Sequence, residues 1–202
     1  MTMKWEQSIT SINSYVQSLK EEGIDADVTV AAFSSFPKYR NNIVSTNLKS
    51  IDFNVIRNEV NLKNFSPISY TEVSPNGNTP LYDATGELLN LADKKSAKKT
   101  VIIIVTDGEE NSSKDYSLKA IKDRISTCKN RGWEVLFLGA EFNPEYIAGS
   151  FGIGAEKIFR SVPANKIKDG MIWYAAASAS YASGKLGASG IDTTSMKSKI
   201  EG

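Results

Sequence analysis

The sequence contains no histidine and a single cysteine, Cys128. The absence of histidine excludes histidine-based acid–base catalysis, Ser-His-Asp triads and histidine-ligated zinc. One cysteine cannot form an internal disulfide, which suits a reducing compartment. A metal bound by this chain would therefore be a hard cation on oxygen ligands, with Mg²⁺, Mn²⁺ or Ca²⁺ as the candidates.

The sequence also lacks an excess of charge and a long apolar run. Lys and Arg number 24 against 23 for Asp and Glu, so the formal net charge is +1. This balance gives no electrostatic reason to expect nucleic acid or a membrane surface as a partner. The apolar runs are too short for a membrane span, and the first residues contain no apolar signal region. We therefore expect a cytoplasmic protein, and 202 residues suit one domain.

Helical stripes and apolar strands alternate along the chain. Apolar residues spaced by three and four positions predict a first helix from Trp5 to Leu19. A buried strand over 27–33 follows, and a polar stretch over 34–78 holds short strand candidates at "NNIVS" and "DFNVI". The remaining pattern predicts a helix over 79–94, a strand over 100–106, a helix over 111–132, a strand over 133–140, a short helix over 143–152, a short strand over 156–162 and a last helix over 167–183.

Local signals predict how the helices begin and where the domain ends. Thr79 followed by Pro80 is typical of an N-cap and a first helical position, and Ser112 or Ser113 is expected to cap the helix over 111–132. Cys128 continues the apolar stripe of that helix, which indicates a core residue and not a nucleophile. We expect a single domain over 1–185, followed by a flexible polar tail over 186–202, which is rich in Gly, Ser and Lys.

This alternation predicts an α/β fold with a Rossmann-like, mainly parallel central sheet flanked by helices on both faces. Sheets of this class bind ligands outside the carboxyl ends of their strands. Asp107 follows the apolar run "VIIIV" directly, and Thr79 begins the preceding helix at the same edge. A carboxylate and a hydroxyl at one edge are hard oxygen ligands, so both residues are candidates for a metal site.

Each candidate also has an ordinary structural explanation. Asp before Gly often only makes a turn, and Thr before Pro often only caps a helix. Glu109, with Glu110 beside it, and Asp83 are accessory candidates for the same site. Acids at these positions are more often helix-entry residues that interact favourably with the helix dipole.

The two motifs together are more specific than either alone. "SPNGNTPLYDAT" followed by a helix and then "VIIIVTDGEEN" resembles two elements of the metal-ion-dependent adhesion site of a von Willebrand factor A (VWA) domain. Over residues 3–182 the chain is similar to the small single-domain versions of bacteria and phages. The resemblance implies a non-enzymatic protein–protein interaction module in which Thr79 and Asp107 hold Mg²⁺, or Mn²⁺ or Ca²⁺. An acidic side chain of an unknown protein partner would then complete the coordination.

The chain departs from this family at its start. Family members begin with a strand that ends in D-x-S-x-S, and here "MTMKWEQ" already lies at the first helix. The resemblance implies that the lacking strand is the central one of the sheet, and that its motif supplies most of the metal's side-chain ligands. With Thr79 and Asp107 alone, we expect metal binding to be weak or lost.

Three explanations of this departure are open. The sequence is an incomplete copy that starts at an internal Met, or the strand over 27–33 pairs directly with that over 100–106, or a partner supplies a strand by β-augmentation. We favour the first, because in the resembling family a Met often follows the motif just before the helix.

Two other functional classes compete with the adhesion-type module. A Mg²⁺-dependent hydrolase could use the acidic loop after 101–106 to activate water, with Asp83 as the best candidate for a second carboxylate. A purely structural interaction module without metal could use the aromatic side chains near the same edge, which are Tyr39, Phe65, Tyr70 and Tyr82. Each of these aromatic residues is also explained by ordinary packing.

Overall fold

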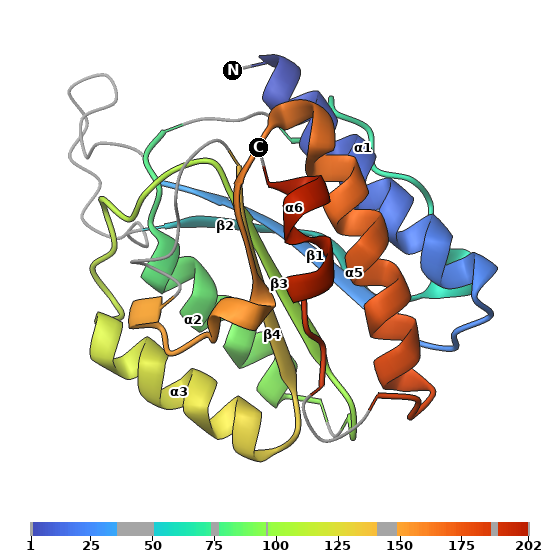
Figure 1. The fold of residues 1–202 in the computed structure, drawn as a ribbon. Helices are drawn as coiled ribbons and strands as arrows, with labels where there is room; N and C mark the ends of the chain where they lie inside the picture. Colours follow the sequence, from blue (N-terminus) through green and yellow to red (C-terminus); the bar gives the residue numbers. More distant parts are fainter. Residues whose placement is uncertain are drawn as a thin grey trace.

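The computed structural model describes residues 2–35, 51–73, 77–95, 97–140, 149–186 and 190–201. Within them the chain is a mixed α/β protein in which strands and helices alternate, as the sequence predicts (Figure 1). The main helices are α1 (Thr2–Glu21), α2 (Leu81–Asp93), α3 (Leu118–Asn130), α5 (Ile167–Ala182) and the short α6 (Lys197–Ile200). Single 3-10 turns are η1 (Leu62–Asn64), η2 (Ala155–Lys157), η3 (Ala164–Lys166) and η4 (Thr194–Met196).

Three parallel strands form the centre of one sheet, in the order β3 (Val101–Thr106), β4 (Glu134–Ala140) and β5 (Ile158–Val162). Val101 is opposite Glu134 and Thr106 is opposite Gly139, so β3 and β4 pair along their whole lengths. All seven residues of β4 are buried, because it has strand neighbours on both edges and helices on both faces. The predicted parallel sheet is thus confirmed for these strands.

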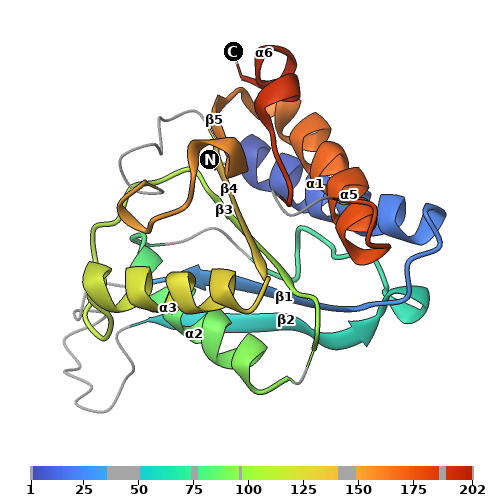
Figure 2. The ribbon, with the colours of Figure 1, turned by 60° about the horizontal axis from the view of Figure 1, so that its bottom comes forward.

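The other two strands form a separate antiparallel pair. β1 (Asp27–Ser34) pairs with β2 (Asp52–Asn61), with Asp27 opposite Asn61 and Ser34 opposite Asp52. In the described residues β1 has no strand neighbour besides β2, and β3 has none besides β4 (Figure 2). The expectation of one central sheet is therefore not met by these residues, and the explanation that 27–33 pairs directly with 100–106 is wrong.

Helices cover both faces of these strands, with α2 and α3 on one side and α1 and α5 on the other (Figure 1). On the α2–α3 side, Leu81 and Leu89 pack in one cluster with Ile102 and Ile104 of β3. Cys128 of α3 belongs to this cluster, and burial raises the pKa of its thiol. It is thus a core residue, as its spacing predicts.

Two predicted details of the helices are wrong. α3 begins at Leu118, and its N-cap is Ser117, whose Oγ accepts the N–H of Ala120. Ser112 and Ser113 do not cap it, because both lie in the loop before the helix, where their N–H groups donate to the carboxylate of Glu110. α2 has Pro80 as its N-cap residue, and no side chain of that residue caps the helix, so Thr79 does not have the predicted capping role.

The predicted flexible tail is also corrected. Of 186–202, residues 190–201 include η4 and α6, and Ile191 and Ile200 are buried in a cluster with Met171 of α5. The spaced isoleucines explain this packing, which the Gly, Ser and Lys content concealed. The strand candidate "NNIVS", the aromatic Tyr39 and most of the predicted helix over 143–152 lie outside the described residues.

Candidate functional site

The structure brings Thr79 to the loop that carries Asp107. An added Cβ on Gly108 would lie 2.7 Å from Oγ1 of Thr79, so the hydroxyl rests against the Asp107–Gly108 turn. The Thr79 N–H donates to Oδ1 of Asn111 at 2.9 Å, and the Asn111 N–H donates to the Thr79 carbonyl at 3.2 Å. Asp107 is exposed and Thr79 is half-buried. The predicted proximity of these two segments is therefore present, and glycine at position 108 makes it sterically feasible.

Glu110 holds the same loop on the first turn of α2. Its Oε1 accepts the N–H groups of Ser112 and Ser113 at 2.8 and 2.7 Å, and its Oε2 accepts the N–H of Tyr82 at 2.9 Å. Oγ of Ser113 donates to Oε2 of Glu110 and accepts the N–H of Asp83. The loop thus supplies the acceptors that begin α2, which is the function expected of Thr79. Glu109, the accessory candidate, is exposed.

Asp83 has a structural role that its sequence position did not reveal. The residue is fully buried, and its carboxylate accepts the N–H groups of Lys114, Asp115 and Tyr116 at 2.8 to 2.9 Å. These bonds satisfy three consecutive donors of an irregular segment that would otherwise be costly to bury. Neither an accessory metal ligand nor a surface helix-entry acid is a good description of this side chain.

Ser35, which the sequence analysis did not single out, connects the end of β1 to this site. Its Oγ donates to Oγ of Ser112 at 2.7 Å, and its backbone exchanges two hydrogen bonds with Asn78. Gly77 has a φ of 74°, and a Cβ there would lie 2.1 Å from the Ser35 carbonyl oxygen. Glycine is therefore required beside this bridge. The carboxyl ends of β1 and β3 and the start of α2 consequently meet at one edge, which we call the carboxyl edge.

The carboxyl edge does not fit a tightly held cation. Thr79 and Asp107 offer one hydroxyl and one carboxylate, while the carboxylates of Asp83 and Glu110 already accept backbone N–H groups. Within the described part of the chain, no three Asp, Glu or Cys side chains are grouped as they would be around a metal ion. A divalent cation here would keep mostly water ligands, which implies weak binding.

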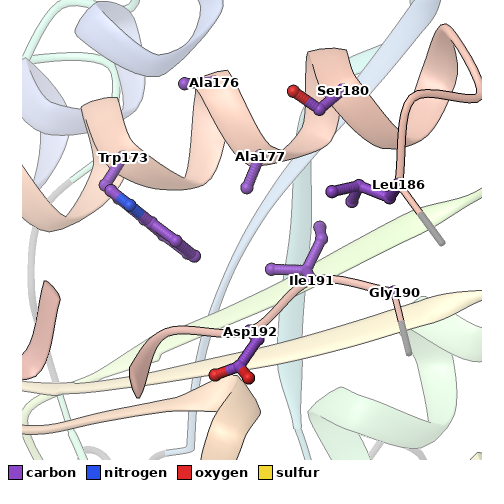
Figure 3. A pocket seen from close by; sticks show the side chains of 8 residues that line it. All are labelled: Trp173, Ala176, Ala177, Ser180, Leu186, Gly190, Ile191 and Asp192. Carbon is purple, nitrogen blue, oxygen red and sulfur yellow. The ribbon is translucent and has the colours of Figure 1, made fainter. Parts of the chain in front are cut away.

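A concave region lies between α5 and the segment before η4. It is a pocket of about 310 Å³, lined mainly by apolar side chains such as Trp173, Leu186 and Ile191 (Figure 3). The carboxylate of Asp192 points away from α5 and accepts the N–H of Thr194. Hydrogen bonding with the side chain of Thr194, and then with its backbone, lowers the pKa of this carboxyl. The pocket therefore lacks the convergent polar groups of a ligand site.

Comparisons of the chain with protein-family models, with curated proteins and with solved structures gave no match. Among the helices in the described ranges, none has the length and apolar character that crossing a membrane requires.

Proposed function

We propose that this chain is a non-enzymatic protein–protein interaction module of the VWA type, and that the carboxyl edge is a binding surface. The observation that supports this function is the contact of the Thr79 hydroxyl with the Asp107–Gly108 turn. It joins the two sequence motifs on which the resemblance depends. The surface itself presents exposed polar side chains from one loop, including Asp107, Glu109 and Asn111.

Hydrogen bonds to α2 and β1 hold this surface in place. Asp83 and Glu110 together fix the loop over 110–116 on α2, and Ser35 fixes it to β1. A binding surface that is rigid before the partner arrives loses less conformational entropy on binding. In this proposal a weakly bound Mg²⁺ or Mn²⁺ on Asp107 and Thr79 contributes at most a bridge to an acidic side chain of the partner.

A hydrolytic function is less well supported. It needs a second carboxylate that is available to activate water near Asp107. Asp83 was the best candidate in the sequence, and its oxygens are instead occupied by three backbone donors.

Mn²⁺ is a sensitive probe of the proposed weak cation site. Paramagnetic broadening of the amide signals of Asp107 and Gly108 should appear on titration, with a dissociation constant of about 1 mM or weaker. Asp107→Asn should abolish the broadening, whereas Glu22→Gln, an exposed acid on the turn after α1, should leave it unchanged. A micromolar calorimetric site that Asp107→Ala removes would contradict the prediction of weak binding.

The protein-binding function needs a separate test. A photoreactive phenylalanine analogue in place of Glu109 should cross-link to a defined protein in cells, and the same analogue in place of Glu22 should not. Equal labelling from both positions, or Mg²⁺-dependent turnover of phosphate esters that Asp107→Asn abolishes, would argue against a non-enzymatic binding module.

A further inference from the structure

The outer face of α5 is apolar although it is exposed to solvent. Figure 1 shows α1 along one side of α5 and α6 along the other, so a third side faces outward. Helices of soluble proteins normally have charged residues on such a face. The sequence over 170–184, which covers most of α5 and its end, has no charged residue. Ile172 is 39% exposed, and among the described residues only Tyr70 is another large apolar side chain with such exposure.

The outward residues of α5 form a ridge with a groove beside it. Ile172, Ala176 and Ser180 are spaced by four positions and lie within about 80° of one another around the helix axis. Trp173 lies next to this ridge and, with Leu186, lines the apolar pocket between α5 and the segment before η4 (Figure 3). Ridges of residues four apart pack into the grooves of a facing helix. The face therefore has the shape that a second helix requires.

Opposite charges lie at the two ends of this ridge. Asp169 is exposed in the first turn of α5, and Lys185 is exposed just beyond its last turn. The helical rise separates the two residues by about 24 Å, so they cannot pair within one chain. Neither has an ion-pair partner within the described ranges. Each charge interacts favourably with the dipole of its own helix end, but the dipole does not explain the apolar residues between them.

We propose that the outer face of α5 is a self-association surface, on which the α5 of a second copy of this chain packs antiparallel. A two-fold contact uses the same patch on both subunits, so the patch must be complementary to its own reverse. Asp169 and Lys185 are equally distant from position 177, and an antiparallel pair centred there places each Asp169 opposite the partner's Lys185. A parallel pair would bring like charges together. Ile172 and Trp173 then supply the apolar centre of the contact, from which water is excluded.

The contact is small, so we expect the dimer to be weak. One helix of this length buries less surface than the roughly 1,600 Å² of a stable complex. We therefore expect a dissociation constant of about 10–100 μM. Both charge pairs can form only if the helices cross at about 20° and not at about 50°. The surface does not include Asp107 or Thr79, so this inference goes beyond the proposed function and does not depend on it.

Sedimentation velocity tests self-association on the unaltered chain. Between about 5 and 500 μM the mean sedimentation coefficient should rise from that of a monomer toward that of a dimer. Ile172→Lys should weaken the dimer at least about tenfold, because a charge would be buried in the apolar centre. Tyr70→Lys is the matched control at the other exposed large apolar side chain, and it should leave association unchanged. Thermal denaturation should show that both variants fold as the parent chain does.

A charge exchange tests the antiparallel arrangement. Asp169→Lys alone and Lys185→Asp alone place like charges together at both ends, so each should weaken self-association about tenfold at low salt. An equimolar mixture of the two variants should dimerise within about threefold of the parent, because the mixed dimer again has opposite charges at both ends. The helix dipole alone predicts lower stability of each variant and no recovery on mixing.

Disulfide formation locates the two-fold axis. Ala176 is exposed and lies beside the centre of the proposed contact, so Ala176→Cys brings each thiol to its own copy. Under mild oxidation this variant should form a disulfide-linked dimer at least about tenfold faster than Thr10→Cys, at an exposed position of α1. Cys128 is buried and should not interfere.

Several results would overturn the proposal. One is a chain that stays monomeric over the whole concentration range. Equal effects of Ile172→Lys and Tyr70→Lys, absence of recovery on mixing, or equal cross-linking at positions 176 and 10 would each exclude this contact. Binding of the monomer to phosphatidylcholine vesicles that Ile172→Lys abolishes would assign the face to a lipid surface instead. Failure of Mn²⁺ to bind at Asp107 would affect only the proposed function of the carboxyl edge.

Discussion

β1 and β4 are both short apolar strands between helical layers, yet they differ completely in burial. Every residue of β4 is buried, and no residue of β1 is. β4 has β3 and β5 as neighbours, whereas β1 has only β2. Composition does not explain the contrast, since "DVTVAAF" and "EVLFLGA" are both mainly apolar. Burial of a strand therefore depends on lateral pairing as well as on the helices above and below it.

The largest expected effect on stability is that of removing the carboxylate of Asp83, which connects α2 to the loop over 114–116. Asp83→Ala removes the acceptor of three backbone N–H groups and should lower the free energy of unfolding by about 3 kcal/mol. Urea denaturation of the variant and of the parent chain measures the difference. Glu109→Ala is the matched control in the adjoining loop, and because Glu109 is exposed we expect a change within about 0.5 kcal/mol. Equal losses for both variants would contradict the structural role of Asp83.

The same substitution in the two strands tests the comparison directly. Val135→Ala in β4 creates a cavity in a packed core and should cost about 2 kcal/mol, whereas Val30→Ala in half-exposed β1 should cost about 1 kcal/mol or less. Similar costs at both positions would mean that β1 is as well packed as β4.

Tyr15 is expected to make stability depend on alkaline pH. The side chain packs against two of the core clusters and its hydroxyl donates to Oγ of Ser178 at 3.1 Å. Burial raises its pKa from 10.0 to about 12. Folding therefore favours the neutral phenol, and this contribution is complete below pH 10 and is lost as the pH rises toward 12.

Tyr15→Phe should lower stability by about 1 kcal/mol at pH 7, because the hydrogen bond is lost, and should make the decrease above pH 10 less steep. Thermal denaturation between pH 7 and pH 11 measures both effects. Tyr70→Phe, at a side chain that is 56% exposed, is the control and should leave the profile unchanged. An identical alkaline decrease in the Tyr15→Phe variant would assign that decrease to other groups, such as Tyr174, whose pKa burial also raises.

The smallest expected effect is a gain in stability, on substitution of Thr85. Oγ1 of Thr85 on α2 is buried without a hydrogen-bond partner among the described residues. Thr85→Val replaces this hydroxyl by a methyl group of similar size and should stabilise the chain by about 0.5–1 kcal/mol. Thr10→Val, at an exposed position of α1, is the comparison and should change stability less. A loss of stability in Thr85→Val would show that the hydroxyl has a partner, such as a bound water.

Local pattern was sufficient to predict most of the elements. Apolar spacing located α1 and the buried face of α3, although α3 begins at Leu118 and not at residue 111. The run "VIIIV" located β3. Burial on a helix face or in a covered strand leaves such a signal in the sequence. The proximity of Thr79 and Asp107 also followed, since both occur where chain direction reverses at one edge of a parallel sheet.

Long-range hydrogen bonds were not predictable from the same signals. Asp83 and Glu110 look like ordinary acids near helix starts, and only the fold shows that their oxygens accept N–H groups about 30 residues away or from their own loop. The break between β1 and β3 was equally hidden, because a strand's sequence records whether its faces are covered and not which edges are paired. The buried isoleucines at 191 and 200 were missed because they are isolated in polar sequence.

The edges of β1 and β3 that are unpaired in the described residues also bear on how this chain behaves at high concentration. An unpaired strand edge is a template for pairing with the same edge of another copy, and it opens locally more easily than a strand that is paired on both sides. The chain is therefore expected to be cleaved by proteases first near β1 and last near β4, whose two edges are both paired.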